Sequence, residues 1–242
     1  MSEKRQKNHS LVLALALLIG ACGNDGEGTD AVNATKPTGT TGSSNGAALP
    51  GERVETFPYQ GAPLAVVGVA ADDTLNVRSG PGPQFDVVFE LGPMAMNATA
   101  TGHNRSVGEA GVWSEIAVDA RTGWAKTAFL LQPGEVRDIT AALFPTPADR
   151  PTAKTMLELG QTVARLRARG DREPDIVVVE HPTVGDLGEI TVDVIGLGDD
   201  SVGGERLKVF AEPGPGRERF TVRTVEATTF CSRGVTKERL CV

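Results

Sequence analysis

LNVRSGPG, residues 75–82, carries the strongest folding signal in this chain. Leu75 and Val77 alternate with polar residues, so a strand here would place both apolar side chains on one buried face. The Ser-Gly-Pro-Gly run after them combines permissive glycines with a rigid proline, which is typical of a tight turn. We therefore predict a strand that ends in a sharp corner, and we interpret the stretch as scaffold before ligand contact.

Short apolar runs surround this stretch, with Gly and Pro between them, at intervals of roughly ten residues. They occupy residues 64–69, 86–91, 95–102, 112–118 and 123–130. This rhythm predicts a small all-β barrel.

The run VWSEIAV at residues 112–118 alternates as a half-buried strand does. If Ile116 and Val118 lie in the core, Trp113 points to the other face and is expected to be at least partly exposed. A partly exposed Trp suits ligand binding, and a Trp that closes the end of the barrel is the alternative. Together with polar neighbours on the strands, the candidate ligand-binding residues are Trp113, Glu115, Asn76 and Arg78.

The same stretches resemble the bacterial SH3 (SH3b) domain. LNVRSGPG is followed, in the family's order and at typical spacing, by ELG at 90–92, TG at 101–102, W..I at 113–116 and GW....FL at 123–130. The resemblance implies an SH3-like barrel over residues 62–133, with departures at Ala125, where the family usually has Val, and at Phe129, where it often has Tyr. It also implies binding, because such barrels in some proteins recognise peptide stems or bridges of peptidoglycan. Residues 64–131 carry four basic and seven acidic residues, so we expect affinity from an aromatic surface rather than from charge.

Beyond residue 138 the periodicity becomes that of a helix. Residues 152–170 form an amphipathic pattern, with Pro151 placed for the first turn and Gly170 for the stop. Four strand candidates follow, at residues 176–180, 189–195, 205–211 and 219–230. The glycine-rich loop at 196–204 is interpreted as a hairpin connection, because a strand rather than a helix follows it. The predicted fold is mainly β: a small SH3-like barrel, then an α+β domain over residues 138–242 with one helix on an antiparallel sheet.

The N-terminus has the features of an export signal. Basic residues precede an apolar run of nine residues, 11–19, whereas a membrane span takes about 20 residues. The residues up to Cys22 resemble the lipobox of bacterial lipoproteins, in which the cysteine is lipidated; an ordinary secretory signal cleaved near Ala21 is the alternative. We expect a lipoprotein signal peptide over residues 1–21, attachment to the outer face of a membrane through Cys22, and a flexible Gly/Ser/Thr-rich tether over residues 22–61.

Cysteine and histidine usage narrows the chemistry. Cys231 and Cys241 can pair in an oxidising compartment, and we expect a disulfide that staples the C-terminal strand. With Cys22 lipidated, no free thiol remains for a cysteine peptidase; the sequence has no GxSxG motif, and its three histidines are too scattered for a zinc site. We expect no metal and no cofactor, and a formal net charge of −7 argues against nucleic acid as a partner.

These features favour a non-catalytic, membrane-anchored envelope lipoprotein whose SH3b barrel binds a cell-wall component, such as peptidoglycan, or an envelope protein. The alternative is a cell-wall hydrolase, targeted by its barrel, with catalytic residues in the C-terminal domain, because carboxylate pairs are too common to be diagnostic. Acidic side chains clustered in a deep cleft would favour the hydrolase. A shallow groove lined by Trp113 or Trp124 would favour the binding protein.

Overall fold

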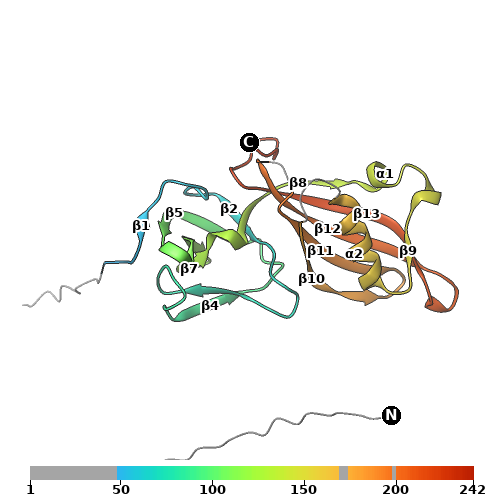
Figure 1. Ribbon diagram of the computed structural model, residues 1–242, viewed down its shortest axis with the longest axis horizontal. Helices are drawn as coiled ribbons and strands as arrows, with labels where there is room; N and C mark the ends of the chain where they lie inside the picture. Colours follow the sequence, from blue (N-terminus) through green and yellow to red (C-terminus); the bar gives the residue numbers. More distant parts are fainter. Residues whose placement is uncertain (1–47, 169–173, 198–199) are drawn as a thin grey trace, which may run out of the picture. The chain divides into compact units, whose positions relative to one another are not determined.

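Strands dominate the computed structural model, which describes residues 48–168, 174–197 and 200–242. Within these ranges strand accounts for 49% and there are two α-helices, so the prediction of a mainly β fold is confirmed. Residues Ala47–Val242 form one compact unit (Figure 1). The predicted signal peptide, Cys22 and the tether up to residue 47 lie outside the described residues.

An antiparallel sheet of 13 strands runs through this unit. Its main path has the order β10-β11-β12-β13-β8-β2-β5-β6-β7-β3-β4, with β1 paired to β5 and β9 paired to β13. The strands are β1 (Glu52–Arg53), β2 (Pro63–Val66), β3 (Leu75–Arg78), β4 (Val87–Leu91), β5 (Ala98–Ser106), β6 (Val112–Val118), β7 (Arg121–Lys126), β8 (Leu130–Asp138), β9 (Thr152–Ala153), β10 (Asp175–Val184), β11 (Gly188–Ile195), β12 (Val202–Pro213) and β13 (Phe220–Cys231).

The N-terminal half, residues 48–131, builds its core from alternate residues of short strands. Leu75 and Val77 of β3 are buried, as are Ile116 and Val118 of β6, so the core faces predicted for both strands are confirmed. The corner after β3 brings Gly80 against the Phe85 ring, where a Cβ would collide with the ring. The glycine of the predicted turn is therefore required by packing.

Residues 48–61 belong to the folded unit, which corrects the last part of the predicted tether. β1 pairs with β5, and Phe57 is 9% exposed within the core of the N-terminal half. The buried Asn104 amide donates hydrogen bonds to the carbonyl oxygens of Thr56 (2.8 Å) and Pro58 (3.1 Å). The polar average composition of the tether concealed the apolar residues near its end, and burial of one of them, Phe57, helps to hold the segment in place.

The C-terminal half, residues 132–242, is a long antiparallel sheet that carries α2 (Met156–Arg167) on one face (Figure 1). The four predicted strands are confirmed as β10 to β13. β11 and β12 pair as antiparallel neighbours, in agreement with the predicted hairpin, but residues 202–204 of the predicted connection already belong to β12. α1 (Thr140–Leu143) is a short helix that the sequence did not predict. The core under α2 is formed mainly by Leu159, Val163, Ile190, Val192, Leu207, Val209 and Val225.

α2 begins later than predicted. Thr152–Ala153 form β9, and Thr155 is the N-cap, whose hydroxyl accepts a hydrogen bond from the Glu158 N–H at 3.1 Å. The Glu158 carboxylate accepts in turn from the Lys154 N–H at 3.2 Å. A Thr-x-x-Glu sequence is a recognised helix start, so the correct boundary was readable from the sequence. Gly170, the predicted stop, lies outside the described residues.

β8 joins the two halves. Its first residues pair with β2, and residues 132–138 pair with β13. Ala65, Val67 and Phe230 form a small buried apolar cluster in which side chains of both halves meet. The expected interval between the barrel and the α+β domain, residues 134–137, thus lies in a strand that both halves share.

Cys231 and Cys241 form the predicted disulfide, with their Cα atoms 5.1 Å apart. The bond closes the C-terminal loop onto the end of β13. In this loop Arg239 donates a hydrogen bond from Nε to the carbonyl oxygen of Gly134 at 2.9 Å. The closed loop therefore also contacts β8.

Candidate functional site

A groove of about 540 Å³ lies where the chain after β2 and β3 meets β6, β7 and β10. Three of the four predicted ligand-binding residues line it, namely Asn76, Arg78 and Trp113. Its walls are largely apolar, with a few polar side chains among them. The residues that matter most for its chemistry are Val69, Phe129, Val177, Asp73 and Lys126, together with the three just named.

Two cations reach this groove from neighbouring strands. Arg78 is the last residue of β3, and Lys126 is the last residue of β7. The Arg78 side chain is oriented because its Nη1 donates a hydrogen bond to the carbonyl oxygen of Phe85 at 2.8 Å. Asp73 is the only acidic side chain among the described residues that line the groove. The groove is therefore locally cationic, although the N-terminal half carries an excess of acidic residues.

Trp113 is buried, which corrects the prediction of a partly exposed side chain. Its exposed fraction is only 6%. The alternation of β6 does place it opposite the core face of Ile116, but the 3₁₀ turn at Gly108–Ala110 lies against it, and the indole N–H donates to the carbonyl oxygen of Ala110 at 3.2 Å. The prediction assumed that only one face of β6 is covered. Trp113 therefore shapes a wall of the groove and offers no open stacking surface.

Glu115 does not line the groove. Its carboxylate accepts a hydrogen bond from the Thr101 hydroxyl at 2.8 Å and lies 2.8 Å from Nδ1 of His103. Both partners belong to the neighbouring strand β5. Glu115 is thus engaged in cross-strand contacts, and the fold separates it from the other three predicted residues.

Sequence reasoning missed Lys126, Phe129 and Val177 as lining residues. The first two lie in the GW....FL stretch at residues 123–130, so a signal for them was present. Only Trp124 of this stretch was considered for a groove, and it is 4% exposed and does not line this one. Val177 lies in the stretch that was predicted to form a separate domain. No local pattern indicates that this part of the chain reaches a groove of the N-terminal half.

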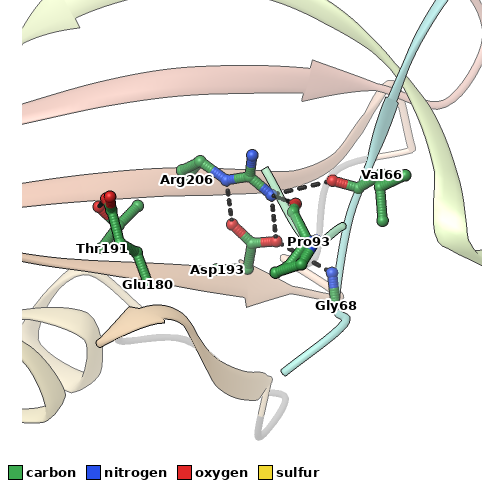
Figure 2. Close-up of polar contacts among 7 residues, drawn as sticks. All are labelled: Val66, Gly68, Pro93, Glu180, Thr191, Asp193 and Arg206. Atoms are coloured by element: carbon green, nitrogen blue, oxygen red, sulfur yellow. Dashed lines mark hydrogen bonds and ion pairs between the residues drawn. The ribbon is translucent and has the colours of Figure 1, made fainter. Parts of the chain in front are cut away.

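A buried ion pair at the junction of the two halves holds one edge of this groove (Figure 2). Asp193 of β11 and Arg206 of β12, whose side chains are 0% and 5% exposed, share two hydrogen bonds of 2.7 and 2.9 Å. Arg206 Nη2 also donates to the carbonyl oxygens of Val66 and Pro93, each at 2.9 Å. Asp193 Oδ2 accepts from the N–H of Gly68 at 2.9 Å. Bidentate pairing and these backbone contacts offset the large cost of burying two charges.

No family model matches the chain, and no curated protein or solved structure is detectably similar to it. Among the residues that the structure describes, no three or more His, Cys, Asp or Glu side chains are grouped so that they could hold a metal ion. No helix in the same ranges is long and apolar enough to cross a membrane. We base the functional proposal on the groove because it brings together three of the predicted ligand-binding residues, Asn76, Arg78 and Trp113.

Proposed function

We propose that this chain is a non-catalytic lipoprotein of the bacterial cell envelope that binds a peptide component of the cell wall in the groove. The N-terminal half acts as an SH3-like barrel, and the C-terminal half is an α+β module packed beside it. The observation that carries the proposal is the groove itself, in which two cationic side chains, Arg78 and Lys126, stand beside apolar walls.

This combination suits a peptide with a free carboxylate. The planar guanidinium of Arg78 can hold a carboxylate through parallel hydrogen bonds, and Lys126 adds a second positive charge. Phe129, which is half-buried, offers apolar surface to a small side chain next to that carboxylate. The short peptides of the cell wall carry both kinds of group. The proposal thus places the affinity in charge and small apolar contacts, because the buried Trp113 cannot supply an open aromatic surface.

Attachment through Cys22 would keep the groove close to the wall. A lipidated cysteine carries at least two acyl chains, which anchor a protein firmly, whereas a single chain binds a membrane only weakly. Cys22→Ser should therefore abolish partition of the protein into the detergent phase. Intact mass spectrometry of the wild-type chain that shows no acyl mass would contradict the anchor.

Binding is tested with the full chain and purified peptidoglycan sacculi. Arg78→Ala/Lys126→Ala should lower the affinity by about tenfold or more, because a hydrogen bond to a charged group contributes roughly 1.5–3 kcal/mol. The matched control is Arg53→Ala/Lys237→Ala, which removes the same charge from two exposed positions outside the groove and should bind like the wild type.

Three results would overturn the proposal. The wild-type chain could fail to bind sacculi at all. The two double variants could lose the same affinity, which would indicate non-specific attraction. Release of soluble wall fragments by the purified protein would identify it as a hydrolase instead.

A further inference from the structure

We propose that the C-terminal half is part of the binding site and helps to set its selectivity. In this inference, which rests on the proposed function, Val177 of β10 forms one wall of the groove. The Asp193–Arg206 pair positions the segment at residues 66–71, which forms the adjacent wall. The site is then complete only when the two halves are packed together.

Val177 presents its side chain to the groove because of the alternation of β10. Its neighbours Ile176 and Val178 pack against the core under α2, so the side chain between them points away from that core. Val177 is half-buried and lines the groove together with Val69, Ala70 and Phe129. A branched aliphatic wall accepts a small apolar group of a ligand and excludes a bulky or charged one.

The segment at residues 66–71 is held by the C-terminal half at successive backbone positions. Arg206 binds the carbonyl of Val66, and Asp193 binds the N–H of Gly68 (Figure 2). Farther along, the N–H of Ala71 donates to the carbonyl oxygen of Val178 at 2.9 Å. The anchored residue 68 and the next two residues, 69 and 70, line the groove. The position of this wall is therefore fixed by contacts from β10, β11 and β12.

Gly68 allows the segment to turn between its anchors. Its φ is +67°, a conformation that favours glycine, and a Cβ there would lie in ordinary contact with Ile195, 3.7 Å away. The backbone conformation rather than lack of space thus calls for glycine. Because the Gly68 N–H points to Asp193, the turn and the ion pair form one arrangement.

A steric change at Val177 tests the wall directly. Val177→Trp in the full chain should fill part of the groove and weaken binding to purified sacculi by about tenfold. Val184→Trp is the matched control, because Val184 is 44% exposed at the far end of the same strand and outside the groove. It should bind like the wild type. If Val177→Trp fails to fold, Val177→Ala should fold and change the affinity by about threefold, because it removes only part of the wall.

A separate experiment tests whether Asp193 positions the wall at residues 66–71. Asp193→Asn keeps the shape of the side chain but weakens its hold on Gly68. At a temperature where circular dichroism shows the variant fully folded, its affinity for sacculi should fall by roughly threefold or more, and amide exchange at Gly68 should accelerate. A purely structural role would leave the affinity of the folded protein unchanged.

The outcomes separate this inference from the proposed function. If the Arg78→Ala/Lys126→Ala variant loses binding while the Val177 and Asp193 variants bind normally, the groove binds the wall without help from the C-terminal half, and the inference is wrong. If the wild-type chain does not bind sacculi, the proposed function is wrong and the inference falls with it.

Discussion

The junction between the halves and the groove beside it both place charged side chains among apolar ones. The charges at the junction are buried and paired, whereas those in the groove have no carboxylate partner among the described contacts. At the junction Asp193 and Arg206 are buried, and they bind each other and the backbone of the N-terminal half. In the groove Arg78 donates to one carbonyl group, and Lys126 is exposed. The two regions share residue Gly68, which lines the groove and is bound by Asp193.

This difference distinguishes charges that hold the fold from charges that can take a ligand. When a buried charge is separated from its partner, the folded state is destabilised by several kcal/mol. Such a charge therefore stays with its partner and is not available to a ligand. An exposed charge stays hydrated and can exchange water for a ligand at low cost. Mutations at the junction should therefore lower mainly the free energy of unfolding, and mutations of the groove cations should lower mainly the affinity for the ligand.

The largest effect is expected at Asp193. Asp193→Ala leaves the buried Arg206 guanidinium without its carboxylate and should lower the free energy of unfolding by about 3–5 kcal/mol, measured by urea denaturation. That is a large part of the roughly 5–15 kcal/mol available to a typical domain. Loss of the Asp193 acceptor also frees the N–H of Gly68.

The control for this prediction is Asp193→Leu/Arg206→Met. Removing both charges and filling their volume should cost less than Asp193→Ala, because no buried charge is left unpaired and the remaining loss is confined to the backbone groups of Val66, Gly68 and Pro93 that the pair had bound. A double variant that is as unstable as Asp193→Ala would indicate that packing and the backbone hydrogen bonds at the junction, rather than the pairing of the two charges, carry the stability.

The second effect, at Trp113, sharpens the comparison within the groove. Because Trp113 is 6% exposed, Trp113→Ala should lower the free energy of unfolding by about 3 kcal/mol. Arg78→Ala, at the same groove, should change the unfolding free energy far less. If Trp113→Ala is as stable as the wild type and loses only binding, the ring is available to a ligand, and the structural role given to it here is wrong.

The third effect concerns the disulfide between Cys231 and Cys241, at the end of β13. Cys231→Ser/Cys241→Ser should lower the free energy of unfolding by about 2–3 kcal/mol, since the bond closes a short loop. Arg239 should then lose its ordered contact with Gly134, and a protease should cut the C-terminal loop faster than in the wild type. Equal stability and equal proteolysis with and without the bond would show that the loop is held by its other contacts.

Much of the fold could be predicted because its signals are local. The alternation of Leu75 and Val77 identified a core face, and the run that follows identified the corner at Gly80. The start of α2 also has a local sequence signal, in Thr155 and Glu158, although the prediction placed the start earlier. Burial of Phe57 was missed because composition averaged over a long polar stretch hides the few apolar residues at its end.

The site could be predicted only in part, because its remaining walls depend on contacts between distant segments. Asn76 and Arg78 were found since they alternate with core residues of one strand. The prediction that Trp113 is partly exposed was wrong, because alternation indicates which face of the strand a side chain lies on but not what covers that face. Val177 reaches the groove, and the Asp193–Arg206 pair binds the backbone of Val66 and Gly68 beside it, only through the packing of the two halves. The sequence has no short-range pattern for that packing.

The smallest effect is expected at Asp138, an exposed carboxylate at the end of β8. Hydrogen bonds from the Thr140 side chain and then from its backbone N–H, at 2.8 Å, hold the pKa of Asp138 below its ordinary value of 3.8, and Arg150 acts in the same direction. Because the pKa is lower in the folded than in the unfolded chain, ionised Asp138 stabilises the folded state above about pH 4, and this contribution is lost as the pH falls through the folded-state pKa.

Asp138→Asn should therefore lower the free energy of unfolding slightly at pH 7, and the difference from the wild type should shrink as the pH falls below about 4. Urea denaturation at several pH values measures both quantities, and Asp186→Asn, at an exposed position in the β10–β11 turn, controls for the loss of one surface charge. Because Asp138 is solvated and Asp193 is buried, the loss at Asp138 must be a small fraction of the loss at Asp193. Equal losses at the two aspartates would break the distinction between charges that hold the fold and charges that remain open to solvent and ligand.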